Sequence, residues 1–517
     1  MKKILLAGMI TALLCVFSNV PGVMAQSTAD ASVQEMEVAK VKHDLVVSVS
    51  SFGSLRKAAL LVAEKINPLA SMSVSAVLGN DSQILPKGIA TSGAIGLVAN
   101  ADSESPTQVG GVLGFIPVSD AADKKEFSLK LKAMAPAAMV KIEDNTAFIA
   151  LDAKTKTPAD PASLLGGLEK RYLFALQMAP KKFTNLMKIS AASAPEPEAV
   201  EKFSEVLAMI DTVLLGVNVD KKGTILIDSL LQPAAGSEMA KTLAKTAETK
   251  SKLAGFYDPK AAASFQGVYF VTPEIAEAFK TGMESDESMP DAIKAIITDT
   301  LEKGKIDFGG SWDVNKKGGM TTFLAVSVAD GAAVRAFLEK EVKEKRVNID
   351  FDVATVVPNT NIKAHRVKDE EGGIIVLAAS YVFLAFGTGG DDLLEPLKKK
   401  VVATLTAAAP ETTYQAHVNA AAFAAAPMMN GADFSGSLSL KGYVTGKGIQ
   451  SRVEVTSDFI AAAANIALMA FQQGMQAGAG MSMPDDDDEY EMDGGMGGAS
   501  FRIKPIPADD DEEEDEE

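Results

Sequence analysis

A short turn sequence occurs twice in this chain and constrains its fold more than any other feature. It reads Val-Asp-Lys-Lys-Gly at residues 219–223 and Val-Asn-Lys-Lys-Gly at residues 314–318. Asp or Asn opens such a turn by bonding its own backbone, and Gly takes the positive φ that closes it. Strand-like residues flank both copies, and residues 444–448 are similar to them. We therefore predict three β-hairpins at these positions.

A helix-start signal accompanies the hairpins. Asp120 and Asp330 each precede an alanine by two residues and a phenylalanine by seven, and each follows an apolar strand-like stretch. Aspartate is a favoured N-cap because its carboxylate accepts hydrogen bonds from unpaired backbone N–H groups. Ser237, and Ser457 or Asp458, occupy the same place after the other hairpins. We expect each of these positions to begin a helix.

The order strand, helix, hairpin, helix, hairpin, helix occurs in residues 44–250 and again, with longer insertions, in residues 263–474. We predict two tandem homologous halves of α+β class, with largely antiparallel sheets because hairpins join most strands, and with helices packed on one face. A groove between the halves would be the natural binding place. Further strands are predicted at residues 45–50, 139–151, 265–271, 347–353 and 374–386.

Three kinds of stretch carry a resemblance: GVYFVTPEIAEAF at 267–279, FIPVSDAAD at 115–123, and the two lysine-containing turns. Together they resemble a loosely defined group of large secreted bacterial proteins, often without assigned activity, that carry duplicated α+β halves behind a signal peptide. The resemblance covers about residues 40–475. It implies an exported, duplicated fold and transfers no functional residue.

The N-terminus has the parts of a secretory signal peptide. Two lysines precede an apolar run from residue 4 to residue 17, and Val-Met-Ala at 23–25 is a small-residue cleavage site. We expect residues 1–25 to be removed between Ala25 and Gln26, and residues 26–43 to form a linker. The protein is then expected to be exported, to a periplasm or to the exterior of the cell.

Cysteine usage and hydropathy limit the remaining chemistry. The single cysteine, Cys15, lies inside the apolar run and follows Leu14, so it does not fit a lipoprotein signal. Beyond residue 25 the sequence has no cysteine for a disulfide or a thiolate site. No later stretch reaches the 18 apolar residues or more of a spanning helix, so no transmembrane segment is expected.

The C-terminal residues 478–517 are strongly acidic. Sixteen Asp and Glu residues lie between 485 and 517, against two basic residues. We expect most of this tail to be disordered, because its acidic groups repel one another and few apolar side chains are present. Within it an alternating apolar and basic stretch is a candidate edge strand or partner-binding element: Phe501, Arg502, Ile503, Lys504 and Ile506.

Catalytic and cofactor motifs are not found. His43, His365 and His417 lie in different strand regions without metal-ligand spacing. Ser54 and Lys57 match the S-x-x-K motif of serine penicillin-binding enzymes. Lys280-Thr281-Gly282 matches the K-T-G motif of the same enzymes, but it falls at a predicted helix end instead of on a strand. The glycines at 442–448 and 387–390 lack the spacing of phosphate loops and fit turns better. We predict no catalytic residue, no metal site and no cofactor.

The sequence therefore favours an exported, non-catalytic envelope or extracellular protein that acts as a scaffold for a protein partner or a small ligand. The alternatives are a secreted hydrolase without a recognisable motif and a periplasmic carrier of apolar molecules. Without the tail and the signal peptide the chain is only mildly acidic and has no basic stripe, so nucleic acid is not expected as a partner. The sequence does not determine the ligand or the oligomeric state.

Overall fold

The structure is a computed structural model. It describes residues 36, 38–66, 72, 88–101, 109–120, 122–152, 155–185, 204–247, 250–271, 273–284, 289–314, 319–368, 372–387, 393–406, 412–420 and 434–466. The predicted signal peptide with its Ala25–Gln26 cleavage site, the tail segment Phe501–Ile506 and most of the 26–43 linker lie outside these residues. No helix within the described ranges is long and apolar enough to cross a membrane.

Within the described residues, eighteen β-strands form one sheet. The strands are β1 (Leu45–Val49), β2 (Ile95–Ala101), β3 (Val109–Pro117), β4 (Met139–Glu143), β5 (Thr146–Ala150), β6 (Phe174–Met178), β7 (Ile210–Val219), β8 (Ile225–Pro233), β9 (Ala263–Phe270), β10 (Lys305–Val314), β11 (Met320–Ser327), β12 (Ile349–Thr355), β13 (Lys363–Val367), β14 (Gly373–Ala378), β15 (Tyr381–Gly387), β16 (Tyr414–Asn419), β17 (Ser437–Thr445) and β18 (Gly448–Val455).

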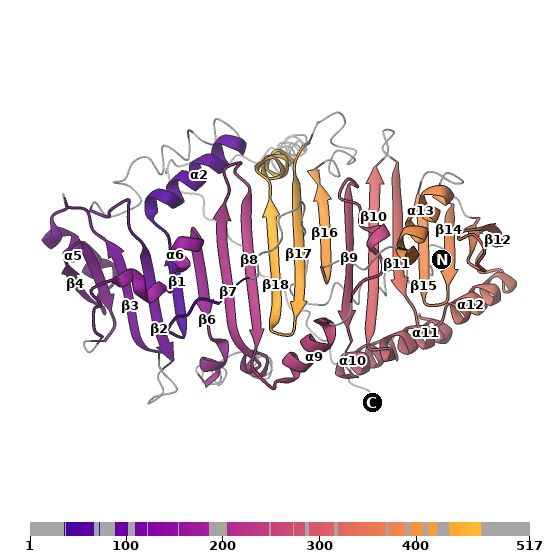
Figure 1. The fold of residues 1–517 in the computed structure, drawn as a ribbon, viewed down its shortest axis with the longest axis horizontal. Coiled ribbons are helices and arrows are strands. Elements are labelled where there is room, and N and C mark those ends of the chain that lie inside the picture. Colours follow the sequence, from indigo (N-terminus) through magenta and orange to yellow (C-terminus); the bar gives the residue numbers. More distant parts are fainter. Residues whose placement is uncertain are drawn as a thin grey trace, which may run out of the picture. The chain divides into compact units, whose positions relative to one another are not determined.

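The pairings of these strands are all antiparallel, which confirms the expected sheet type. Across the sheet the order is β4, β5, β3, β2, β1, β6, β7, β8, β18, β17, β16, β9, β10, β11, β15, β14, β13 and β12 (Figure 1). The chain is α+β in class, because hairpins supply most of the connections.

Helices cover the sheet. Among the described residues they are α2 (Phe52–Ile66), α5 (Lys124–Met134), α6 (Leu168–Arg171), α9 (Glu238–Ala247), α10 (Pro273–Glu284), α11 (Asp291–Glu302), α12 (Gly331–Lys343), α13 (Leu394–Thr406), the 3₁₀ turns η1 (Pro161–Leu165), η2 (Pro180–Lys182) and η3 (Ala254–Phe256), and unlabelled helices at residues 204–208 and 457–466.

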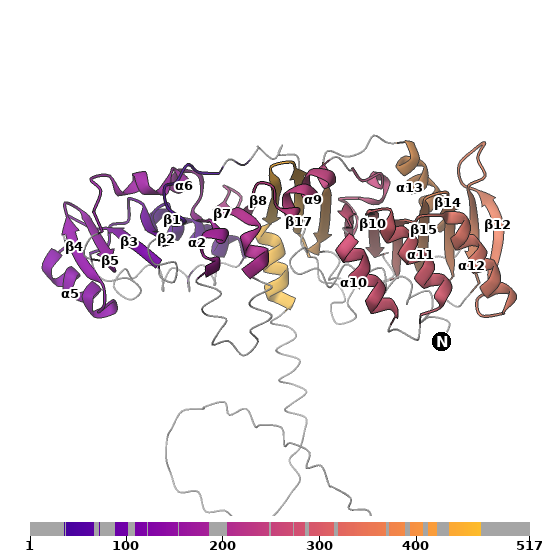
Figure 2. The same cartoon turned by 90° about the horizontal axis from the view of Figure 1, so that it is seen from below.

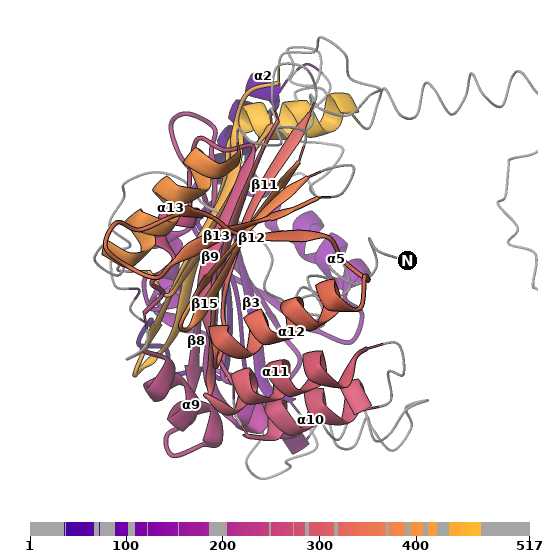
Figure 3. The same ribbon diagram turned by 90° about the vertical axis from the view of Figure 1, so that its right-hand side faces the viewer.

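These helices lie on both faces of the sheet, so the expectation of helices on one face is wrong. In β14, Ile374 packs in a core with α13 and η3, whereas the next residue, Ile375, packs in a core with α11 and α12. Figures 2 and 3 show α13 on one side of the sheet and α10, α11 and α12 on the other. The unbroken apolar run from residue 374 to 386 is typical of strands buried on both faces.

The predicted hairpins agree with the structure where it describes them. Strands β7 and β8 pair around the first turn, in which the Asp220 carboxylate accepts hydrogen bonds from the N–H groups of Lys222 (2.7 Å) and Thr224 (2.9 Å). Gly223 there has a φ of 84°. Strands β17 and β18 pair around the third turn and β10 with β11 around the second, although residues 315–318 lie outside the described residues.

Three local expectations need correction. Asp330 is the N-cap of α12, but Asp120 does not cap α5, which begins three residues after the expected place with Asp123 as its N-cap. The Asp120 carboxylate instead accepts a hydrogen bond from the Asn145 side chain. Residues 139–151 form two strands and not one, because Asp144 takes a φ of 46° and turns the chain back into β5. Residues 374–386 likewise fall in two paired strands, β14 and β15, which a turn at residues 379–380 joins.

Candidate functional site

A pocket of about 400 Å³ lies at the ends of three neighbouring strands, where β10 begins, β11 ends and β15 begins. Four lysines line it: Lys250 and Lys252 from the loop between α9 and η3, Lys303 from the end of α11, and Lys305 from the start of β10. All four are exposed. The volume lies in the range of small-molecule sites.

The buried carboxylate of Asp307 joins the strand wall of the pocket to its loop wall. It accepts hydrogen bonds from the Ser251 hydroxyl (2.6 Å), the Lys252 N–H (2.7 Å) and the Tyr381 hydroxyl (3.1 Å). Its own N–H donates to the Ser327 hydroxyl at 2.8 Å. Because both carboxylate oxygens are engaged, Asp307 fixes the loop that carries Lys252 against β10 and β15.

Burial raises the pKa of Asp307, and the three hydrogen bonds to its carboxylate together with the nearby Lys305 partly offset that rise. Burial also raises the pKa of the Tyr381 hydroxyl, with a further contribution from the neighbouring Asp307. Tyr381 therefore stays protonated and donates to Asp307. Its ring lies 5.8 Å from that of Phe383, which in turn stacks on Phe256 of η3 at 5.5 Å. This aromatic stack fixes the loop a second time.

The lysines of the pocket form no side-chain ion pair among the described residues, and the buried carboxylate of Asp307, near Lys305, is already hydrogen-bonded by the protein. Helix α11 ends at this pocket, and the partial negative charge of its C-terminus offsets part of one lysine charge. A local excess of positive charge remains in a chain whose net charge is −18.

Hydroxyl and small apolar groups complete the lining. Ser327 and Ser380 add hydroxyls to the wall, whereas the Thr300 hydroxyl is already used: it donates to the Ile296 carbonyl at 2.7 Å and accepts from the Ala329 N–H at 3.1 Å. The apolar members, Val268, Val328 and Ala329, are small and leave room beside the polar groups. The lining thus offers cations and hydrogen-bond donors around a volume suited to a small anion.

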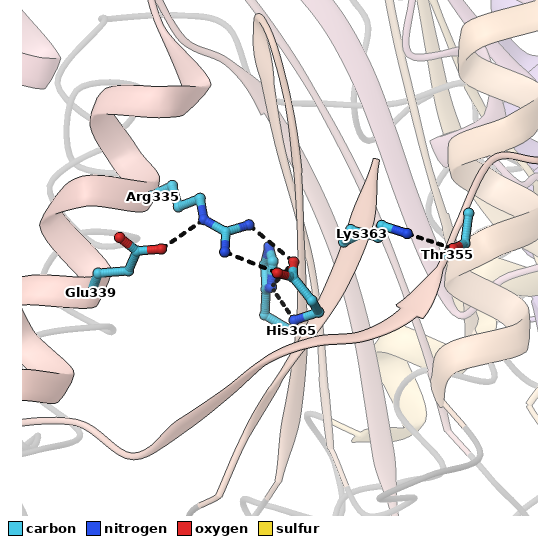
Figure 4. Close-up of polar contacts among 6 residues, drawn as sticks. Arg335, Glu339, Thr355, Lys363 and His365 are labelled. Carbon is cyan, nitrogen blue, oxygen red and sulfur yellow. Dashed lines mark hydrogen bonds and ion pairs between the residues drawn. The ribbon is translucent and has the colours of Figure 1, made fainter. Parts of the chain in front are cut away.

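A second polar cluster lies at β12 and is shown in Figure 4. Arg335 on α12 donates to both carboxylate oxygens of Asp352 at 3.0 Å and, from Nε, to Glu339 at 2.7 Å. Nδ1 of the buried His365 accepts a hydrogen bond from the Asp352 N–H at 3.1 Å. Burial, followed by the charge of Arg335, lowers the pKa of His365. A neutral imidazole is therefore part of the support for this strand.

Asp352 is held in an unusual backbone conformation by these contacts. Its φ is 59°, and the pairing of β12 with β13 shifts register between Asp350 and Ala354. A bulge with a left-handed non-glycine residue persists only where its surroundings fix it. The Arg335 and His365 contacts supply that support, so this cluster stabilises a strand, and the lysine-lined pocket is the better candidate for a binding site.

The other histidines do not form a site either. His417 on β16 is buried, which lowers its pKa, and it lies opposite Ser264 of β9 and Ser439 of β17. His43 precedes β1. Among the described residues no group of three or more His, Cys, Asp or Glu side chains is placed to hold a metal ion.

The structure separates the remaining motif candidates. Ser54 lies in α2 and Lys280 in α10, and these helices cover different strands of the sheet (Figure 1). The glycines at 442–448 belong to β17 and the β17–β18 turn, as expected. Gly387 ends β15, and residues 388–390 lie outside the described ranges.

The groove expected between residues 44–250 and 263–474 is replaced by direct strand pairing. Strand β8 pairs with β18 along residues 225–231, and Arg452 donates to the Asp228 carboxylate from Nε (2.7 Å) and Nη2 (2.9 Å) across this seam. Two edge strands satisfy each other's backbone groups here, which leaves no opening of the expected kind. The pocket lies instead within residues 250–381.

Sequence reasoning did not identify this pocket. Its residues come from helix α11, from the four strands β9, β10, β11 and β15 and from the loops between elements, so no spacing in the sequence connects them. One local signal was present: Lys250, Lys252, Lys303 and Lys305 form two Lys-x-Lys pairs, each next to a predicted element boundary. No family model, no curated protein and no solved structure matches the chain.

Proposed function

We propose that the protein is an exported, non-catalytic scaffold whose lysine-lined pocket binds a small anionic ligand, such as a phosphate ester or a dicarboxylate. The observation that carries this proposal is the set of four exposed lysines around one cavity, none of which forms an ion pair among the described residues, while the lining carboxylate of Asp307 is already hydrogen-bonded by the protein. Like charges held close together repel one another, so such a set is favourable when an anion enters.

The size of the effect follows from the exposure of the lysines. An anion about 5 Å from an ammonium group gains roughly 1–3 kcal/mol at an effective dielectric constant between water and a protein surface. The attraction between the anion and each exposed lysine of this pocket is expected to be about 1 kcal/mol, because water and salt screen the charges. Together with the hydroxyl groups of Ser327 and Ser380 this supports a dissociation constant of micromolar to millimolar order.

The use of Asp307 favours binding over catalysis. A general acid or base must have an atom directed at substrate, whereas both oxygens of this carboxylate accept hydrogen bonds from the protein. The hydrolase alternative retains one supporting feature, the raised pKa of Asp307 in a polar pocket. The alternative of an apolar carrier is less favoured by this pocket, because its apolar side chains Val268, Val328 and Ala329 are small and four lysines surround them.

Titration calorimetry with inorganic phosphate and with succinate tests the proposal. We expect the variant K303Q/K305Q to bind about 30-fold more weakly than the wild type, because two contributions of about 1 kcal/mol are lost. The matched control K130Q/K132Q removes two exposed lysines from α5 and should leave the affinity unchanged. Equal affinity in all three proteins, or no heat with either anion at about 1 mM, would contradict the proposal.

We also propose that the scaffold consists of two equivalent halves, at residues 44–250 and 263–474. The strand pairings support this, because β1 pairs with β2 and β6 as β9 pairs with β10 and β16. The series β6–β7–β8 corresponds to β16–β17–β18, and β2–β3–β5–β4 corresponds to β10–β11–β15–β14. The last strands, β8 and β18, pair antiparallel, as a two-fold relation requires.

Export remains part of the proposal. It rests on the charged start, the apolar run and the Val-Met-Ala site before Gln26. An extracellular or periplasmic setting is consistent with a scaffold without cysteine after residue 25. Membership of the loosely defined secreted group belongs to the same proposal.

A further inference from the structure

The two ends of the sheet differ in whether they can accept another strand. Strand β4 lies at one end and β12 at the other (Figure 1), and each pairs with one neighbour within the described residues. Such edges carry unpaired backbone N–H and C=O groups, and proteins usually block them with bulges, charges or covering segments. An edge without such blocking features can pair with a strand of another molecule.

The β12 edge is blocked. Its bulge at Asp352 breaks the regular spacing of backbone groups, and the Asp352 N–H is used by Nδ1 of His365. The guanidinium of Arg335 holds the Asp352 carboxylate beside the strand (Figure 4). Lys368 and Asp350 add a further ion pair at 2.7 Å. A strand of another molecule would meet a kinked backbone and fixed charges here.

The β4 edge is regular. All five of its residues pair with β5 without a register shift, so alternate residues direct their N–H and C=O groups away from β5. Apolar side chains are exposed around it: Met139 on β4, Leu151 after β5, and Leu129 and Met134 on α5, which covers this hairpin. These exposures range from 44% to 71%, which is high for side chains of this kind.

We propose that β4 is a self-association edge, through which two copies of this chain pair antiparallel and continue the sheet. The charges of β4 select both the partner and the register. Lys141 and Glu143 lie on the same face of the strand, two residues apart, and form an ion pair within the chain. The Thr157 hydroxyl also donates to the Glu143 carboxylate at 2.6 Å. In a two-fold pairing centred on Ile142, each Lys141 lies opposite Glu143 of the second copy, giving two favourable pairs.

The alternative register is unfavourable. Centring on Lys141 would place the two lysines opposite each other, and like charges directly opposite destabilise a strand pair. The contact of five residues with its flanking side chains is small, so the dimer is weak and reversible, with a dissociation constant of micromolar order. It is independent of the lysine-lined pocket, which lies on other strands.

Sedimentation equilibrium of the full chain with charge-swap variants tests this. K141E gives Glu opposite Glu at both pairs, and E143K gives Lys opposite Lys, so each variant alone should dimerise at least about tenfold more weakly than the wild type. An equimolar mixture of K141E and E143K restores opposite charges at both positions and should recover the wild-type affinity. The double variant K141E/E143K should also recover it.

Two controls keep the result interpretable. K368E reverses a charge at the blocked β12 edge and should leave the dimer unchanged, and thermal melting of each variant shows whether the monomer is folded. A wild type that stays monomeric at about 100 µM overturns the proposal. A dimer that persists equally in K141E, E143K and K368E also overturns it, because the interface must then lie elsewhere.

Discussion

The ion pair between Asp228 and Arg452 offers a test of how β8 and β18 are held together. The side chain of Asp228 is 8% exposed and that of Arg452 is 21% exposed, and two hydrogen bonds of 2.7 and 2.9 Å join them. We consider the variant Arg452→Met, which keeps most of the apolar length of the arginine and removes its charge. The change leaves a buried carboxylate without its partner.

The expected cost follows from this geometry. Removing one partner of a buried ion pair destabilises proteins by about 3–5 kcal/mol, because the remaining charge is poorly solvated. Arg452 also favours the ionised form of Glu454, whose pKa burial raises, so the loss of Arg452 affects two carboxylates. We therefore expect about 4 kcal/mol for R452M. D228V should cost less, about 2 kcal/mol, because the partly exposed guanidinium can turn toward water.

The double variant D228V/R452M separates the charge from the packing. Replacing both partners of a buried pair by apolar side chains is often close to neutral, so we expect this variant within about 1 kcal/mol of the wild type. Urea unfolding followed by circular dichroism measures all three variants, with Lys222→Met in the exposed β7–β8 turn as a control. A loss below about 1 kcal/mol for R452M, or an equal loss for the single and double variants, would mean that the ion pair does not hold β8 and β18 together.

Two further predictions concern His365 and the N-terminus. Because burial lowers the folded-state pKa of His365 below the unfolded value of about 6.5, the unfolded chain binds more protons just below that pH, so stability falls as the pH decreases through this window. Melting temperatures between about pH 7.5 and pH 5.5 should therefore fall less steeply in H365Q than in the wild type, and parallel slopes would contradict the assignment. For export, N-terminal sequencing of the protein recovered from its natural host should begin at Gln26, and a retained Met1 would contradict cleavage.

Local features of the fold could be predicted from the sequence because nearby residues determine them. The turn at Asp220–Gly223 combines an aspartate that bonds its own backbone with a glycine at positive φ, and both are visible in the sequence. The N-cap at Asp330 is of the same kind. Where two candidates stood close together, as with Asp120 and Asp123, the sequence pattern did not determine which aspartate begins the helix.

Features that depend on distant residues could not be predicted. The pairing of β8 with β18 joins residues more than two hundred positions apart, and no local pattern encodes it. The apolar run around Ile374 and Ile375 indicated a strand buried on both faces, and therefore helices on both faces of the sheet. The prediction of helices on one face followed from the hairpin connections alone. The pocket combines both difficulties, since Lys252 reaches Lys303 and Lys305 only after Asp307 fixes its loop.

Anion binding between Lys252, Lys303 and Lys305 can be observed in a crystal of the full chain soaked in selenate, a tetrahedral dianion with strong anomalous scattering. We expect an anomalous peak inside the pocket, within hydrogen-bond reach of these lysines, and its disappearance in K303Q/K305Q crystals. Selenate peaks at other lysines of the surface, with an empty pocket in the wild type, would contradict the account.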